Sequence, residues 1–190
     1  MTMIAPPELM TTEALLALPE DGVYRELFRG EVREKPMTRR SRPHSRTEAK
    51  VVHHLSKWLD GQPEPRGEIV SGEAAVRLHR NPDTTVGVDI AYISAAVSAA
   101  SALDAFLIEG APVLAVEILS RSDTQEDILE KVQAYLDAGV QLVWVIEPIF
   151  RTVTVYRQDA PPELFNINGE LIGDPHMPGL RVAVADLFAR

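Results

Sequence analysis

The sequence predicts an α/β fold in which helices flank a mixed β-sheet. Residues 86–93 and 113–119 are almost continuously apolar, which is typical of strands buried on both faces. Apolar side chains at i, i+4, i+7 and i+8 predict an amphipathic helix from Arg46 to Leu59. A second predicted helix, over residues 124–138, connects the strand at 113–119 to a strand at 142–146, which is the order of a right-handed crossover between parallel strands.

The N-terminal part is predicted to contain short elements before the first long helix. In order, these are a loose tail (residues 1–10), a short helix (Thr12–Leu18) and a hairpin with strands at Tyr24–Phe28 and Glu31–Glu34. Pro19 and Gly22 end the short helix, and Gly30 allows the hairpin turn. Ser45 and Glu48 have the spacing of a capping box at the start of the Arg46–Leu59 helix.

The rest of the chain is predicted to be rich in strands. Two short strands, at 68–71 and 74–79, are separated by Gly72 and lead to the strand at 86–93. Residues 94–105 are rich in Ala and Ser and are expected to form a surface loop or a short helix. The remaining predicted elements are a strand at 152–156, a loop at 175–179 and a final strand or turn at 182–188. We find no internal repeat or linker, so residues 1–190 are expected to form one domain.

Composition excludes several classes of protein. The chain has 190 residues, a net charge of −9 and no cysteine, which excludes disulfides, thiolate metal sites and cysteine nucleophiles. No apolar stretch approaches the roughly 20 residues of a membrane span, and the N-terminus lacks a secretory pattern. We therefore expect a cytoplasmic protein. The acidic balance argues against non-specific coating of nucleic acid, although it is compatible with a nuclease that has a local basic patch.

One candidate patch is a basic run of eight side chains within 18 residues. Its members are Arg33, Lys35, Arg39, Arg40, Arg42, His44, Arg46 and Lys50. The run either contacts phosphates or is an ordinary solvated segment, and its composition fits both interpretations equally.

Two carboxylates interrupt the apolar runs, and they are the main functional signal. Asp89 lies within residues 86–93 and Glu117 within residues 113–119. A buried carboxylate needs a cation, a metal or a hydrogen-bond donor, so two such strands side by side could form a divalent-metal site. Lys131 lies at the border of the apolar stripe of the following helix and can point its ammonium group toward Glu117.

Such a cluster suits phosphodiester hydrolysis with Mg²⁺ or Mn²⁺ bound by Asp89 and Glu117. The metal would polarise a phosphoryl oxygen and activate water, and Lys131 would orient that water or stabilise the transition state. From the residues alone, each acid could equally cap a helix, pair with an arginine or sit at a sheet edge.

An ordered series of motifs adds a resemblance. The series comprises Tyr24-Arg25-Glu26-Leu27, Gly30-Glu31-Val32, Pro43-His44, Val88-Asp89-Ile90-Ala91, Val116-Glu117-Ile118-Leu119-Ser120, Asp127, Lys131, Tyr135, Gly139-Val140, Trp144 and Pro178-Gly179-Leu180. From Thr12 to Phe188 the chain resembles the Uma-type endonucleases, a branch of the PD-(D/E)XK restriction-endonuclease-like nuclease superfamily.

This resemblance implies a restriction-endonuclease-like core, a mixed central sheet flanked by helices with the active site on its central strands. It assigns catalytic roles to Asp89, Glu117 and Lys131. Val88 stands where the motif has proline, and Leu119 stands where the strand motif has lysine. In this family that lysine is moved to the following helix, which is the role given to Lys131.

The implied function is a Mg²⁺- or Mn²⁺-dependent endonuclease that hydrolyses DNA. The alternatives are an inactive nuclease-fold binding or regulatory protein, and a phosphoester hydrolase acting on RNA or small nucleotides. A homodimer would provide two sites for cutting two strands.

Four further side chains are candidates for assisting the site. Glu31 and Glu26 could add a carboxylate or be solvated hairpin residues. Glu48 could help the metal, but the capping box gives it a sufficient structural role. His44 could contact phosphate or assist proton transfer, or could simply be exposed.

Overall fold

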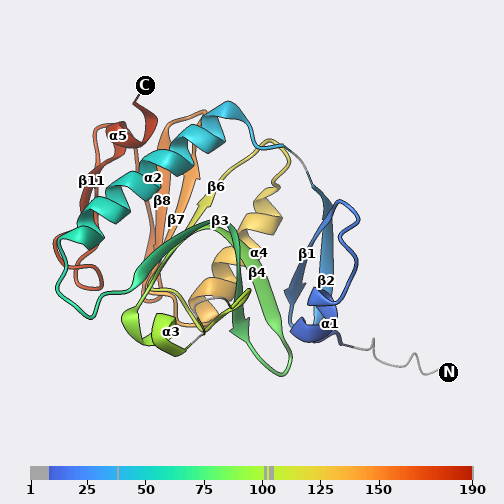
Figure 1. Cartoon of the computed structure of the whole chain (residues 1–190). Coiled ribbons are helices and arrows are strands. Elements are labelled where there is room, and N and C mark those ends of the chain that lie inside the picture. The colour runs from blue at the N-terminus through green and yellow to red at the C-terminus, as the bar shows by residue number, and fades with distance from the viewer. Residues whose placement is uncertain (1–8, 38, 101, 103–104, 190) are drawn as a thin grey trace.

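The computed structural model describes residues 9–189 except residues 38, 101, 103 and 104, so most of the predicted tail lies outside the described residues. The helices are α1 (Thr12–Leu16), α2 (Arg42–Asp60), α3 (Ala95–Ala100), α4 (Gln125–Asp137) and α5 (Val184–Phe188). The strands are β1 (Val23–Phe28), β2 (Glu31–Pro36), β3 (Glu68–His79), β4 (Thr84–Ile93), β5 (Ile108–Glu109), β6 (Leu114–Ile118), β7 (Leu142–Glu147), β8 (Thr152–Arg157), β9 (Ala160–Phe165), β10 (Glu170–Ile172) and β11 (Arg181–Ala183). Figure 1 shows their arrangement.

A mixed nine-stranded sheet forms the centre of the molecule. Its main path runs β2-β1-β4-β6-β7-β8-β9, with β3 paired to β4 and β5 paired to β3. The β6–β7 pair is parallel and is connected through α4, whereas β4 pairs antiparallel with both β3 and β6. The predicted α/β class, the mixed sheet and the crossover helix are therefore confirmed.

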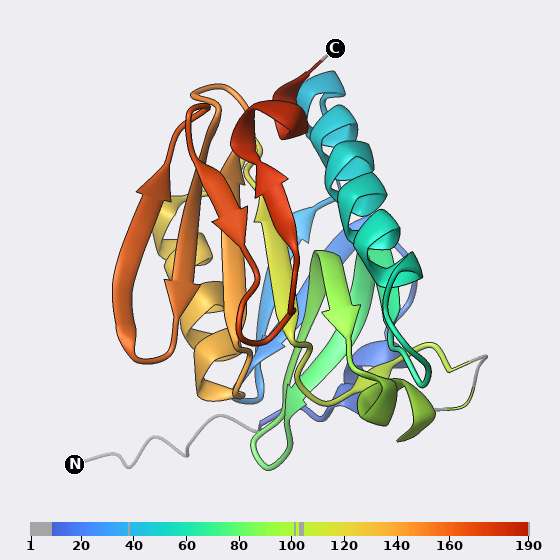
Figure 2. The ribbon, with the colours of Figure 1, turned by 90° about the vertical axis from the view of Figure 1, so that its left-hand side faces the viewer.

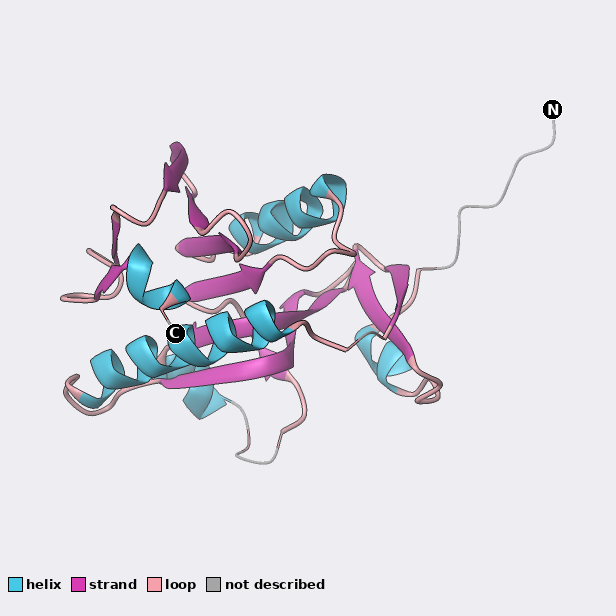
Figure 3. Cartoon of the chain, turned by 90° about the horizontal axis from the view of Figure 1, so that it is seen from above, coloured by secondary structure: helices cyan, strands magenta, loops and turns pink. Residues whose placement is uncertain are grey.

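Helices cover both faces of this sheet, which explains why its central strands are apolar throughout. On one face, α4 contributes Val132 and Tyr135 to a core with strand β7. On the other face, α2 and α5 pack around Trp144 together with the small β10–β11 sheet. Figures 2 and 3 show α4 on one side of the sheet and α2 with α5 on the other. No helix in the described part of the chain has the length and apolar character needed to cross a membrane.

The long helix α2 starts earlier than the sequence pattern suggested. It begins at Arg42 with Ser41 as N-cap, whose hydroxyl accepts a hydrogen bond from the backbone N–H of His44. Ser45 and Glu48 therefore lie inside the helix, and the predicted capping box between them is wrong. Pro43 explains the difference, because proline fits the first turn of a helix, where its missing N–H is not needed.

The strand predictions also change in detail. The two short strands around Gly72 are one continuous strand, β3, and the segment at 182–188 is a strand followed by helix α5. Strand β9 begins Ala160-Pro161-Pro162, which does not resemble a strand in the sequence. Proline is tolerated there because β9 follows β8 at the end of the main path of the sheet, where a backbone N–H is not required on the outer side.

A buried carboxylate, Asp83, fastens the N-terminal helix to the sheet. Its Oδ2 atom accepts hydrogen bonds from the backbone N–H of Thr12 at 2.8 Å and from the Thr12 hydroxyl at 2.7 Å. Arg77 lies 3.5 Å away and also pairs with Glu13 and Glu109. Although burial alone raises the pKa of Asp83, these donors outweigh it and lower the pKa to about 2.

We predict that Asp83→Asn destabilises the protein by about 1–2 kcal/mol at neutral pH, because the ionised acceptor is lost. A lowered pKa in the folded state means that this stabilisation is complete above the unfolded-state value of 3.8 and is lost as pH falls toward about 2. Urea unfolding at a series of pH values should show the two proteins converging at low pH. A constant difference across that range would contradict the prediction.

Candidate functional site

Asp89 and Glu117 lie side by side where strands β4 and β6 separate. The β4–β6 ladder runs antiparallel and its final pair is Ile90 with Val116, so Asp89 and Glu117 are the next two residues in register. Beyond this point β4 pairs with β1, through Leu27 and Thr85. The backbone N–H of Ile118 donates a 2.7 Å hydrogen bond to Asp89 Oδ2 across the gap. The expected proximity of the two strand carboxylates is therefore found.

Helix α4 brings Lys131 and Tyr135 onto the same carboxylate. The Lys131 ammonium donates to Glu117 Oε2 at 2.9 Å and to the carbonyl oxygen of Gly87 at 2.8 Å. It also lies 3.2 Å from Glu26 Oε1. The Tyr135 hydroxyl donates to Glu117 Oε1 at 2.6 Å. The crossover connection explains this geometry, because it folds α4 back over the strand that precedes it.

Burial shifts the ionisation of this cluster. It raises the pKa of Glu117 to about 7, although the charge of Lys131 and the hydrogen bond from Tyr135 oppose the change. Burial would lower the pKa of Lys131, but the charges of Glu117 and Glu26 hold it well above its usual value. For Asp89, burial would raise the pKa, yet neighbouring His44 and the N–H of Ile118 keep it below its usual value. Lys131 therefore stays positively charged beside two carboxylates whose pKa values are shifted in opposite directions.

A second layer of side chains surrounds Lys131. Glu26 accepts hydrogen bonds from the backbone N–H of Gly87 and from the hydroxyl of Tyr24, each at 3.1 Å. That hydroxyl also lies 2.8 Å from Glu73 Oε2. A side chain at position 87 would collide with Tyr24 and Glu73, so glycine is needed for this close approach.

A β-bulge directs Glu73 toward the site. Ser71 pairs with Ile90 and Ala74 with Val88, so β3 advances three residues while β4 advances two. Gly72 and Glu73 both have positive φ values, of 86° and 62°. The left-handed conformation is unfavourable for glutamate, and strained residues of this kind are found at functional sites as well as in turns.

Two cationic or titratable groups approach Asp89 from the start of α2. Arg40 pairs with Glu73 and its Nη2 atom lies 3.4 Å from Asp89 Oδ1. His44 Nε2 lies 3.4 Å from the same oxygen, and His44 Nδ1 lies 3.9 Å from Glu48. His44 is buried, in contrast to the exposed position considered from the sequence.

A cavity of about 490 Å³ opens onto the cluster. Its lining includes Glu26, Glu73, Asp89, Glu117, Asp123 and Asp127 as acids and Lys35, Arg40 and Lys131 as cations. Lys35 and Asp127 form a 3.0 Å ion pair within this lining, and Met37 and Ile128 provide part of its apolar surface. The cavity lining is thus acidic on balance, with six acids and three cations.

The donor set fits a hard divalent cation. Among the described residues, Asp89 Oδ1 accepts no hydrogen bond, so it retains lone pairs for a cation, and Arg40 and His44 each lie 3.4 Å from it. Glu117 supplies a second carboxylate beside it. No cluster of three or more acidic or histidine side chains with metal-binding spacing occurs in the described part of the chain. Asp89 and Glu117 could hold a divalent cation only with water as the remaining ligands.

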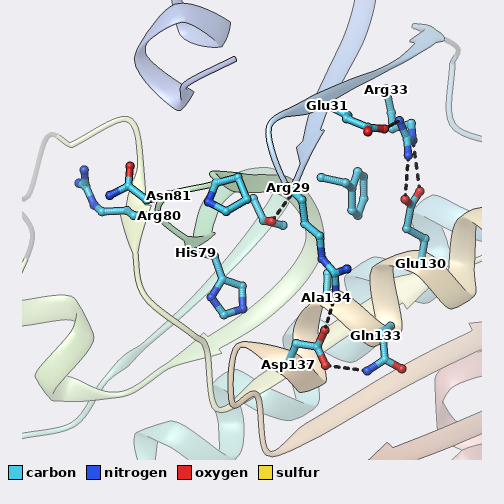
Figure 4. Close-up of a pocket in the computed structure, with 13 residues that line it drawn as sticks. Arg29, Glu31, Arg33, His79, Arg80, Asn81, Glu130, Gln133, Ala134 and Asp137 are labelled. Carbon is cyan, nitrogen blue, oxygen red and sulfur yellow. Dashed lines mark hydrogen bonds and ion pairs between the residues drawn. The ribbon is translucent and has the colours of Figure 1, made fainter. Parts of the chain in front are cut away.

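Glu31 does not belong to this site. It pairs with Arg33 at 3.0 Å and lines a different cavity, of about 660 Å³, where Arg33 also bridges to Glu130 (Figure 4). Figure 4 shows Arg29 and Asp137 paired in the same cavity. From the sequence, Glu26 was as open a candidate as Glu31. In the structure, its Oε1 atom lies 3.2 Å from the Lys131 ammonium group. In the β1–β2 register Glu26 lies opposite Arg33 and Glu31 lies opposite Phe28, so the two acids share a face and are separated by their positions along the hairpin.

The basic run does not form a single surface. Arg33, Lys35 and Arg40 are paired with acids, and His44 is buried. Arg39 and Arg42 remain exposed next to the start of α2. A phosphate-binding surface would therefore be smaller than the run suggests and would lie at this end of the helix.

Two residues of the cluster, Tyr24 and Glu73, were not assigned a role in it from the sequence. Tyr24 is half-buried and its hydroxyl binds a carboxylate, as does the hydroxyl of the fully buried Tyr135. The only sequence signal for Glu73 was its position after Gly72, which interrupts a strand pattern and is typical of a bulge.

Comparisons with known proteins agree with this architecture. A sequence model of the family described as "Uma2: Putative restriction endonuclease" matches residues 12–185. A crystal structure from Anabaena variabilis ATCC 29413, described as a putative nuclease belonging to DUF820, superposes with a TM-score of 0.78 at 23% identity. The match covers 94% of this chain and 97% of that chain. Among curated proteins, none matches this chain.

Proposed function

The chain belongs to the Uma2 restriction endonuclease family, and on this basis we propose that it is a metal-dependent endonuclease that hydrolyses phosphodiester bonds in DNA. The observation that carries the proposal is the meeting of Asp89, Glu117 and Lys131 in the lining of one cavity. Two carboxylates from adjoining strands and a lysine suit phosphoryl chemistry, in which charge stabilisation and positioning supply most of the rate enhancement.

Asp89 and Glu117 would hold the cation, which supplies Lewis-acid stabilisation of the phosphoryl oxygens and a more acidic water when bound. Asp89 is fixed for this by the N–H of Ile118, and Glu117 by the hydroxyl of Tyr135. Because both anchors are buried, the carboxylates stay in place without substrate, which avoids a reorganisation cost during the reaction.

Lys131 would stabilise negative charge as it develops on the phosphoryl oxygens. Its ammonium group has three hydrogens, which face Glu117, the Gly87 carbonyl and Glu26. The Glu26 contact, at 3.2 Å, is the longest of the three. We infer that Lys131 exchanges this contact for a phosphoryl oxygen, while Glu26 keeps its bond to the N–H of Gly87.

A cleavage assay tests the proposal. Purified protein is incubated with supercoiled plasmid, linear duplex, single-stranded DNA or RNA, with Mg²⁺, with Mn²⁺ or with EDTA. We expect cleavage of DNA with either metal and none with EDTA. Cleavage of RNA alone would replace the DNA assignment by the ribonuclease alternative. Metal binding without cleavage of any substrate would favour the alternative of an inactive binding or regulatory protein.

A further inference from the structure

His44 is a buried histidine that faces Asp89 from the first turn of α2. Only 1% of it is exposed, and its Nε2 atom lies 3.4 Å from Asp89 Oδ1. Within the described part of the chain, neither ring nitrogen has a hydrogen-bond partner. Buried polar atoms are nearly always hydrogen-bonded, so an unpartnered imidazole in this place requires an explanation.

Glu48 approaches the other side of the same ring. Its Oε2 atom lies 3.9 Å from His44 Nδ1, and the two residues are one helical turn apart. Because α2 begins at Arg42 and is capped by Ser41, the capping role that seemed sufficient for Glu48 does not exist. Glu48, His44 and Asp89 therefore form a row of carboxylate, imidazole and carboxylate.

The position of His44 indicates that it acts through Asp89 and not on a substrate. Of the described residues, those that line the cavity include Asp89 and Arg40 but not His44, so His44 has no access to a substrate there. The N–H of Ile118 fixes only the Oδ2 atom of Asp89. The orientation of Oδ1, the oxygen available to a cation, is left to groups arriving from the start of α2.

We propose that His44 is a positioning residue that orients Asp89 toward a divalent cation, and that Glu48 orients His44. The inference rests on the proposed function, since it concerns the metal that Asp89 and Glu117 would hold. Partners that orient metal ligands commonly contribute about 10–100-fold to metal affinity, although they never touch the metal. The arrangement also gives α2 a role in the site, which links the helix on one face of the sheet to the carboxylate of β4.

The test measures Mn²⁺ affinity by calorimetry, together with kcat and KM for DNA cleavage. We expect His44→Leu to weaken Mn²⁺ binding by about 10–100-fold and His44→Gln, which retains a side-chain N–H at similar reach, to restore part of it. Glu48→Gln should weaken binding less than His44→Leu. The double variant should be no weaker than His44→Leu alone, because Glu48 acts through His44. Thr47→Ala, which removes another buried polar side chain of α2, is the matched control and should bind Mn²⁺ normally.

Three outcomes would overturn the inference. One is a folded His44→Leu protein that binds Mn²⁺ as tightly as the wild type, even if cleavage is lost. Another is that the losses of Mn²⁺ affinity in His44→Leu and Glu48→Gln add up in the double variant, which would show that Glu48 does not act through His44. If His44→Leu fails to fold, normal Mn²⁺ affinity in both His44→Gln and Glu48→Gln overturns it. In contrast, a wild-type protein that binds no Mn²⁺ would refute the proposed function itself, and the inference with it.

Discussion

Lys131→Met is expected to leave the protein inactive and about 3–5 kcal/mol less stable, because it leaves two buried carboxylates without their cation. Lys131 is the buried partner of both Glu117 and Glu26. Methionine has a similar length and no charge, so it fills the space without replacing the ion pairs. Urea unfolding and a DNA cleavage assay on the same preparation measure both effects.

A second substitution separates the two roles of this lysine. Adding Glu26→Gln to Lys131→Met removes one of the unpaired charges, so part of the lost stability should return while cleavage stays absent. Lys35→Met is the control, because its 3.0 Å ion pair with Asp127 is partly exposed and should contribute about 1 kcal/mol or less. Unchanged stability in Lys131→Met would show that the buried ion pairs contribute little to the fold.

Asp89→Asn should reduce DNA cleavage by about a thousandfold or more with little change in the fold. The asparagine oxygen can still accept the hydrogen bond from the N–H of Ile118, so the local backbone is preserved. A metal contributes several kcal/mol to phosphoryl transfer, and each 1.4 kcal/mol corresponds to about tenfold in rate. Single-turnover cleavage measures the rate, and calorimetry with Mn²⁺ measures whether binding falls in parallel.

The matched control is Asp137→Asn, which changes an acid of α4 whose partner, Arg29, belongs to the other cavity. This variant should cleave DNA at the wild-type rate. Wild-type cleavage by Asp89→Asn would contradict the metal role of Asp89, whereas equal losses in both variants would point to a general effect of removing negative charge.

The secondary structure around the site could be predicted because its signals are local. An apolar run that contains one acid identifies a buried strand with a polar requirement, as at Asp89 and Glu117. The position of Lys131 at the border of a helical stripe depends only on helical periodicity. Helix α2 was less well predicted at its start, because the spacing of Ser45 and Glu48 resembles a capping box until the cap at Ser41 is seen.

The amino-acid sequence by itself determined the α/β class, the crossover through α4 and the three polar residues that need partners in an apolar interior. Only the tertiary structure decided that Glu26 and Glu73 join them while Glu31 faces another cavity, and that His44 is buried against Asp89. The physical reason is that these contacts depend on strand register, on the bulge in β3 and on where α2 begins. A shift of one residue in a strand turns its side chains to the opposite face of the sheet, and local sequence patterns do not fix such a shift.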